Sequence, residues 1–144
     1  MSDFLDSSAL VKRYADEDGV EHVRTIDSVV VCAVARVEVP AAIWRKHRLG
    51  ELSAAHAALL VDEFAWEWHG DADADPVFAV ISLTDDVLET AALACARHGL
   101  RAYDALQLAA ALTAREADDT LTSFVCFDRE LADAASQEGF ATRP

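Results

Sequence analysis

The feature that most constrains the fold is a continuous apolar run, Val29 to Ala33, with helical patterns on both sides of it. Its β-branched residues favour a strand. Because no position in the run is polar, we expect both faces of that strand to be buried. Strands of this kind belong to parallel sheets whose two faces are covered by helices. The sequence therefore predicts an α/β fold with a mostly parallel central sheet.

The rest of the chain alternates in the same way. Further strands are expected at residues 3–6, 77–82, 123–127 and, at an edge, 140–142. Helices are expected from Ser7 or Ser8 to Tyr14, at 21–27, from Val37 to about His47, from Ser53 to Trp68, from Thr84 to about His98, at 103–114 and at 129–137. A loop at 16–19 separates the first two helices.

Two sequence rules place these boundaries. Pro40 is tolerated only where backbone N–H groups have no intrahelical partner, so its helix should begin near Val37. Strands that alternate with helices imply right-handed crossovers and a mostly parallel sheet. No repeat or linker interrupts the pattern, so we interpret residues 1–144 as one domain.

Composition restricts the classes of function. The formal net charge of −14 argues against coating nucleic acid by broad phosphate neutralisation. It fits a carboxylate site for metal ions, a basic partner, or plain solubility. No apolar run is long enough for a membrane span, and Met1–Phe4 lacks the features of a signal peptide. The three cysteines are odd in number and lie in apolar contexts. We therefore expect buried reduced thiols in a cytoplasmic protein with no membrane partner.

Four acidic residues stand where apolar runs give way to turns or helix starts. They are Asp6, Glu38, Asp104 and Asp128. Carboxylates at the ends of buried strands are costly unless something uses them. Ligand sites of parallel α/β sheets lie outside the carboxyl ends of the strands, so the fold predicts that these acids gather at one edge.

Short motifs around these acids resemble those of PIN-domain ribonucleases, and in particular VapC-type toxins of bacterial toxin–antitoxin pairs. The motifs are Asp6–Val11, Arg36–Glu38, Ala102–Ala109 and Phe127–Leu131. The resemblance implies a three-layer α/β/α PIN-like domain that cleaves RNA with Mg²⁺ or Mn²⁺. It carries the catalytic and metal-binding set onto Asp6, Glu38, Asp104 and Asp128, with a supporting hydroxyl from Ser8.

The same resemblance implies partners. They are an RNA substrate (tRNA or rRNA), a cognate antitoxin whose C-terminal segment offers a basic side chain to the acidic pocket, and a second copy of the chain in a homodimer. One position departs from the family pattern. Cys126 stands two residues before Asp128, where the family often has Thr or Ser. A thiol is a weaker hydrogen-bonding group than a hydroxyl.

The chemistry of phosphodiester hydrolysis gives each residue a role. The reaction needs a nucleophilic water, charge relief on the phosphate and help for the leaving oxygen, and carboxylate-bound divalent ions supply these. Asp6 would be the central ligand, with Asp104 and Asp128 completing the main site. Glu38 would bind a second ion or orient the attacking water. Ser8 would hydrogen-bond a metal-bound water or a ligand carboxylate.

Other interpretations stay open from the sequence. Asp6 and Asp128 are also suited to capping helices, Ser8 is as well suited to capping as to catalysis, and Glu38 and Asp104 fit the first turn of a helix. The competing function is a catalytically weak or inactive PIN-like module that binds RNA or protein. The residues after Asp6, Ser7 and Ser8, argue against a receiver domain and a DxD phosphatase. The three tryptophans are expected in the core or an interface, with base stacking as the alternative.

Overall fold

The computed structural model describes residues 2–16 and 20–143. Its central sheet has five parallel strands in the order β3-β2-β1-β4-β5. The strands are β1 (Asp3–Leu5), β2 (Val29–Cys32), β3 (Phe78–Ile81), β4 (Ser123–Val125) and β5 (Ala141–Arg143). The expected α/β class and parallel sheet are confirmed. Because every strand runs the same way, all five carboxyl ends lie on one edge of the sheet.

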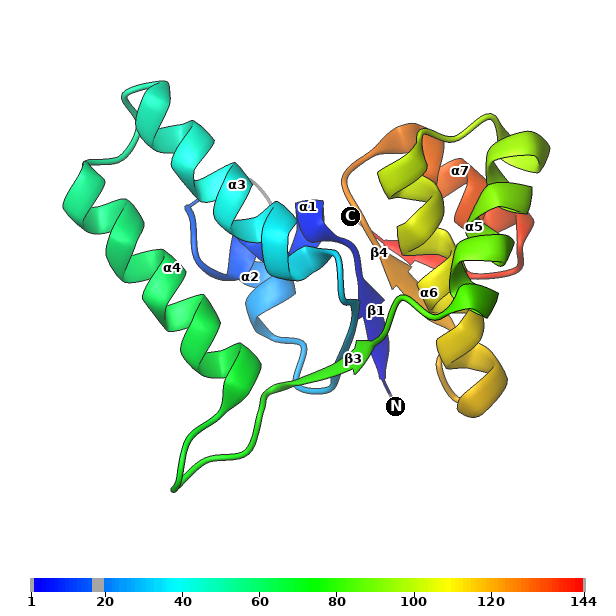
Figure 1. Ribbon diagram of the computed structural model, residues 1–144, viewed down its shortest axis with the longest axis horizontal. Helices are drawn as coiled ribbons and strands as arrows, with labels where there is room; N and C mark the ends of the chain where they lie inside the picture. The colour runs from blue at the N-terminus through cyan, green and yellow to red at the C-terminus, as the bar shows by residue number, and fades with distance from the viewer. Residues whose placement is uncertain (1, 17–19, 144) are drawn as a thin grey trace.

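Helices cover both faces of this sheet (Figure 1). The elements α1 to α4 lie on one side and α5 to α7 on the other. They are α1 (Ser7–Leu10), the 3₁₀ turn η1 (Val11–Arg13), α2 (Val20–Arg24), α3 (Ala35–Arg48), α4 (Ala54–His69), α5 (Asp85–His98), α6 (Ala102–Ala117) and α7 (Arg129–Gln137). The result is the three-layer arrangement that the resemblance implied.

Two hydrophobic cores hold the layers together, one on each face of the sheet. Successive strand residues point to opposite faces, so Phe4 packs in the core under α5, α6 and α7, while Leu5 packs in the core under α1 to α4. The strand β2 supplies both cores and has four buried residues. Its uninterrupted apolar sequence is therefore explained by burial on both sides.

Most helix boundaries agree with the sequence. The side chains of Ser53 and Thr84 cap α4 and α5, and Gly99 ends α5 with a left-handed backbone at φ 66°. Left-handed geometry is readily available to glycine because it has no Cβ atom. Residues 17–19 of the expected loop lie outside the described part of the chain.

Two expectations about helix starts were wrong. The first helix is capped by Asp6 rather than by Ser7 or Ser8, because the strand β1 already ends at Leu5. The helix α3 begins at Ala35, two residues before Val37, so Pro40 stands beyond the first turn. A proline there forgoes the bond that its N–H would donate to the carbonyl four residues earlier. Burial of Val39 and Ile43 from the same helix offsets that loss.

The cysteines and tryptophans differ in exposure. All three cysteines are free thiols, with Cys32 and Cys126 buried and Cys95 partly buried. Trp44 and Trp68 pack against the core beside α4, whereas Trp66 is 51% exposed. Among the helices described, none is both long enough and apolar enough to cross a bilayer.

Candidate acidic active site

Asp6 lies at the carboxyl end of the central strand β1, where the chain enters α1. Its side chain is almost wholly buried at 4% exposure. The Ala9 backbone N–H donates to Asp6 Oδ1 at 2.9 Å, so the carboxylate also caps α1. The pKa of Asp6 is raised to about 7, chiefly by burial and also by the nearby carboxylates of Glu38 and Asp104, against the hydrogen bonds of Ser8 and Ala9. A buried carboxyl of this kind gains from a cation beside it.

Ser8 ties Asp6 to the neighbouring strand. Its hydroxyl donates to Asp6 at 2.7 Å from Oδ1 and 2.9 Å from Oδ2. The same oxygen accepts the Phe127 backbone N–H at 3.0 Å, just beyond β4. Ser8 therefore orients the Asp6 carboxylate and links the ends of β1 and β4.

Glu38 projects from the first turn of α3 toward the same edge. Its Oε1 accepts the Ser7 hydroxyl at 2.8 Å and the Gln107 side-chain amide at 2.9 Å. The Gln107 amide also lies 2.8 Å from Ser7 Oγ. Both bonds go to Oε1, and neither involves Glu38 Oε2.

The roles of Ser7 and Gln107 were not predicted from the sequence. Gln107 is 2% exposed on α6, and its Oε1 is buried with no hydrogen-bond partner in the part of the chain described. The signal was present in the sequence, because Gln107 is the one polar residue between Ala105 and Leu112. A single amide in an apolar helix face needs a polar partner. That partner is Glu38.

Asp104 and Asp128 complete the acidic group from the other helical layer. Asp104 lies in the first turn of α6, 3.6 Å from the Arg101 guanidinium. Burial raises the pKa of Asp104, repulsion from Asp128 adds to the rise, and Arg101 opposes it. Asp128 follows β4 and caps α7, since its Oδ1 accepts the Leu131 N–H at 2.9 Å. The fold therefore brings all five sequence-predicted site residues to one edge.

The donor set suits a hard divalent cation. Carboxylate oxygens are the ligands that Mg²⁺ prefers, and the mutual repulsion among Asp6, Glu38, Asp104 and Asp128 is what a cation relieves. Across residues 2–16 and 20–143, no three His, Cys, Asp or Glu side chains lie close enough together to hold a metal ion. Mg²⁺ keeps several waters and is often held by only one or two carboxylates.

Cys126 lies between these acids and β5. The thiol is buried, and Sγ lies 3.5 Å from the backbone carbonyl oxygen of Asp128. Burial raises the pKa of Cys126 to about 12, and the charge of Asp6 contributes to the rise. The side chain is therefore a neutral thiol at physiological pH and a weak hydrogen-bond donor.

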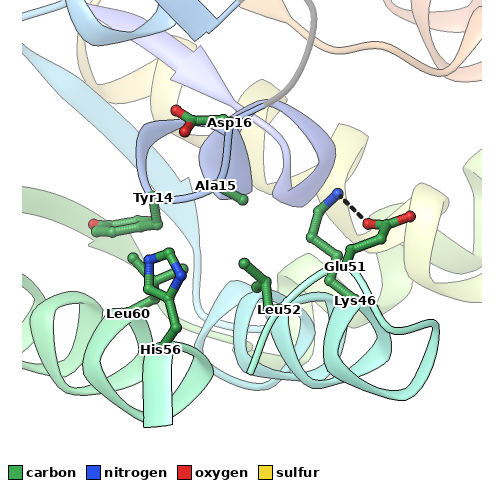
Figure 2. A pocket seen from close by; sticks show the side chains of 8 residues that line it. All are labelled: Tyr14, Ala15, Asp16, Lys46, Glu51, Leu52, His56 and Leu60. Carbon is green, nitrogen blue, oxygen red and sulfur yellow. Dashed lines mark hydrogen bonds and ion pairs between the residues drawn. The ribbon is translucent and has the colours of Figure 1, made fainter. Parts of the chain in front are cut away.

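Apart from the acidic edge, a hollow of about 280 Å³ lies among η1, α3 and α4 (Figure 2). Lys46 and Glu51 form an ion pair of 3.3 Å at one side of it. None of the four acids lines this hollow, whose walls are Tyr14, Ala15, Asp16, Lys46, Glu51, Leu52, His56 and Leu60. The acidic edge and this hollow are separate features of the molecule.

The chain matches a known protein family and resembles a solved structure. The family model described as PIN domain matches residues 4–137, so the chain belongs to the PIN domain family. The crystal structure of PAE2754 from Pyrobaculum aerophilum is similar, with a TM-score of 0.58 and 21% identity over 99% of this chain and 89% of that chain. At that identity the likeness concerns the fold. A search of curated proteins found no match.

Membership in this family indicates a general kind of chemistry. PIN domains are typically nucleases that use divalent metal ions and bind nucleic acid substrates. The acids of this chain lie where a parallel α/β sheet places its ligand site. The geometry of the sheet makes this edge the candidate location for that chemistry.

Proposed function

We propose that this protein is a metal-dependent endoribonuclease and the toxin of a toxin–antitoxin pair. The observation that carries the proposal is the buried Asp6 carboxylate at the carboxyl end of β1, beside the carboxylates of Glu38 and Asp104. Hydrogen bonds from Ser8 and Ser7 hold the carboxylates of Asp6 and Glu38 in place. Buried carboxylates with shifted pKa values are typical of catalytic sites.

The residues divide the work of hydrolysis. Asp6, Asp104 and Asp128 would hold Mg²⁺ or Mn²⁺, which supplies charge relief on the phosphate and an activated water. Glu38 accepts a proton from the attacking water through Oε2, while Ser7 and Gln107 hold its other oxygen. Ser8 orients the Asp6 carboxylate by donating to its two oxygens. Positioning by these hydrogen bonds lowers the cost of ordering the site during reaction.

The partners follow from charge and family. A net charge of −14 favours a basic antitoxin segment, and a cation from that segment fits the acidic edge. RNA, as tRNA or rRNA, is the proposed substrate in the cytoplasm. A homodimer is the proposed assembly.

The direct test is cleavage by the purified chain, freed of any bound partner. Wild type should cut structured RNAs with Mg²⁺ or Mn²⁺, and Asp6→Asn should not. Asp62→Asn is the matched control, because it removes an exposed carboxylate from α4, away from the acidic edge. The proposal is wrong if wild type leaves tRNA and rRNA intact while binding neither metal.

Induced expression separates the enzyme from the alternative, a PIN-like module that binds without cutting. Growth arrest with discrete tRNA or rRNA fragments in the wild type alone supports the nuclease. Arrest with both wild type and Asp6→Asn separates toxicity from the acidic edge and favours the binding module. The thiol at Cys126, in place of a hydroxyl, is the observation that favours this second function.

A further inference from the structure

An aromatic ring stands exposed beside the acidic edge. A hollow of about 250 Å³ adjoins the acids and is lined by Glu38, Arg101, Ala102, Tyr103 and Asp104. Tyr103 lies in the first turn of α6 and is 61% exposed. Its neighbour Asp104 belongs to the acidic group. The Tyr103 ring and the Asp104 side chain therefore line the same hollow.

The surroundings of Tyr103 differ from those of the other exposed or phenolic aromatics. Tyr14 is 6% exposed and donates its hydroxyl to Glu67. Trp66 is exposed, but its indole N–H donates to Asp71 at 2.8 Å. Within the described residues, Tyr103 makes no hydrogen bond and no ring contact. The fold gains little from an aromatic at this position, so its ring is available to a ligand.

We propose that Tyr103 stacks on the base of an unpaired nucleotide next to the scissile phosphate, which makes this hollow a subsite for single-stranded RNA. The inference rests on the proposed nuclease function and specifies its substrate. The Arg101 guanidinium, 81% exposed at the rim of the hollow, provides a cation for the adjoining phosphate.

The strand requirement follows from the geometry of stacking. A base offers its face to a side chain only when it is unstacked, as in loops, bulges and ends of RNA. Every base has such a face, so the subsite selects unpaired nucleotides and tolerates any base. Cuts are therefore expected in loops rather than in duplex stems.

Steady-state cleavage of a hairpin RNA with Mn²⁺ tests this subsite. Tyr103→Ala should raise KM by about tenfold and leave kcat within about twofold, because stacking binds the substrate and transition state alike. Tyr103→Phe keeps the ring and should match wild type. Trp66→Ala removes an exposed ring from α4, which carries none of the four site acids, and should also match wild type.

A cross-link provides a readout that needs no cleavage. Single-stranded RNA containing 5-bromouridine, irradiated with the wild type in Ca²⁺, should form an adduct that mass spectrometry maps to Tyr103. Adduct without cleavage by wild type would keep the subsite and reject the nuclease. An unchanged KM in Tyr103→Ala, with adducts only elsewhere, would overturn the subsite. An unchanged KM with loss of dimer or antitoxin binding would also overturn it, because the ring would then serve a protein interface.

Discussion

The inner acids, Asp6 and Glu38, and the outer acids, Asp104 and Asp128, are held by different means. Side-chain donors from Ser7, Ser8 and Gln107 fix the inner pair. The outer pair depends on helix ends: Asp104 pairs with the exposed Arg101, and Asp128 caps α7. The inner pair is therefore positioned by hydroxyl and amide donors, with Asp6 also capping α1, whereas the outer pair relies on an exposed arginine and a helix cap.

This difference indicates how the molecule keeps close carboxylates at one edge. Burial of Asp6 makes its ionised form costly, and hydrogen bonds offset only part of that cost. Partial exposure lets water screen Asp104 and Asp128. Asp6 should thus govern catalysis and stability strongly, and the partly exposed Asp104 and Asp128 more weakly.

The largest expected effect is on cleavage. Asp6→Asn should lower kcat/KM by about a thousandfold, because Asp6 is the carboxylate coupled to both Glu38 and Asp104. Asp128→Asn should lower it by about tenfold to a hundredfold, since asparagine keeps the cap of α7 and Asp104 remains. Rates from a hairpin RNA with Mn²⁺ measure both, with circular dichroism as the folding control. Equal losses would erase the distinction between inner and outer acids.

The next effect concerns stability of the metal-free protein against pH. Because the folded pKa of Asp6 is raised to about 7, the folded state holds a proton that the unfolded chain releases near pH 4. The contribution of Asp6 is fully present below about pH 4 and is lost as pH rises through about 7. Between about pH 4 and pH 7 this should lower the free energy of unfolding by on the order of 4 kcal/mol. Urea unfolding from pH 4 to 8 measures it.

Asp6→Asn is the control for this pH dependence. Asparagine keeps the cap of α1 and carries no charge, so the decline due to Asp6 should disappear. At pH 8, added Mg²⁺ should raise the stability of wild type more than that of the variant, since ligands of the folded state stabilise it by mass action. An identical decline in both proteins would show that other groups control the pH dependence.

A smaller effect separates positioning from direct participation. Gln107→Leu removes the amide that holds Glu38 and should lower kcat by about tenfold. Combined with Glu38→Gln, the same change should add little, because Gln107 acts through Glu38. A double-mutant cycle on kcat measures this coupling. Simple additivity of the two losses would mean that Gln107 supports the fold and not the acid.

The smallest effect is expected at Cys126. Cys126→Ser replaces the long Sγ contact with the Asp128 carbonyl by a hydroxyl donor. Because the contact goes to backbone near an outer acid, kcat/KM should change by less than about threefold. Cleavage rates with Mg²⁺ and Mn²⁺ measure the change. A gain above about tenfold would show that the thiol limits the outer acids strongly.

Much of the fold could be read from the sequence because its signals are local. The apolar run at β2 and the caps Ser53 and Thr84 each depend on a few neighbouring residues. The start of α3 was misjudged because Pro40 suggests a boundary that tertiary burial of Val39 overrides. Local rules therefore failed where packing energy exceeded a backbone preference.

By itself the sequence determined the α/β class and the placement of Asp6, Glu38, Asp104 and Asp128 at the ends of its elements. Only the tertiary structure decided which donors hold those acids. Ser7 and Gln107 are 100 positions apart, yet their side chains meet at 2.8 Å beside Glu38. A hydrogen bond depends on distances of tenths of an ångström, which arise when β1, α3 and α6 pack together. Periodicity predicts elements, whereas such contacts exist only once the layers have assembled.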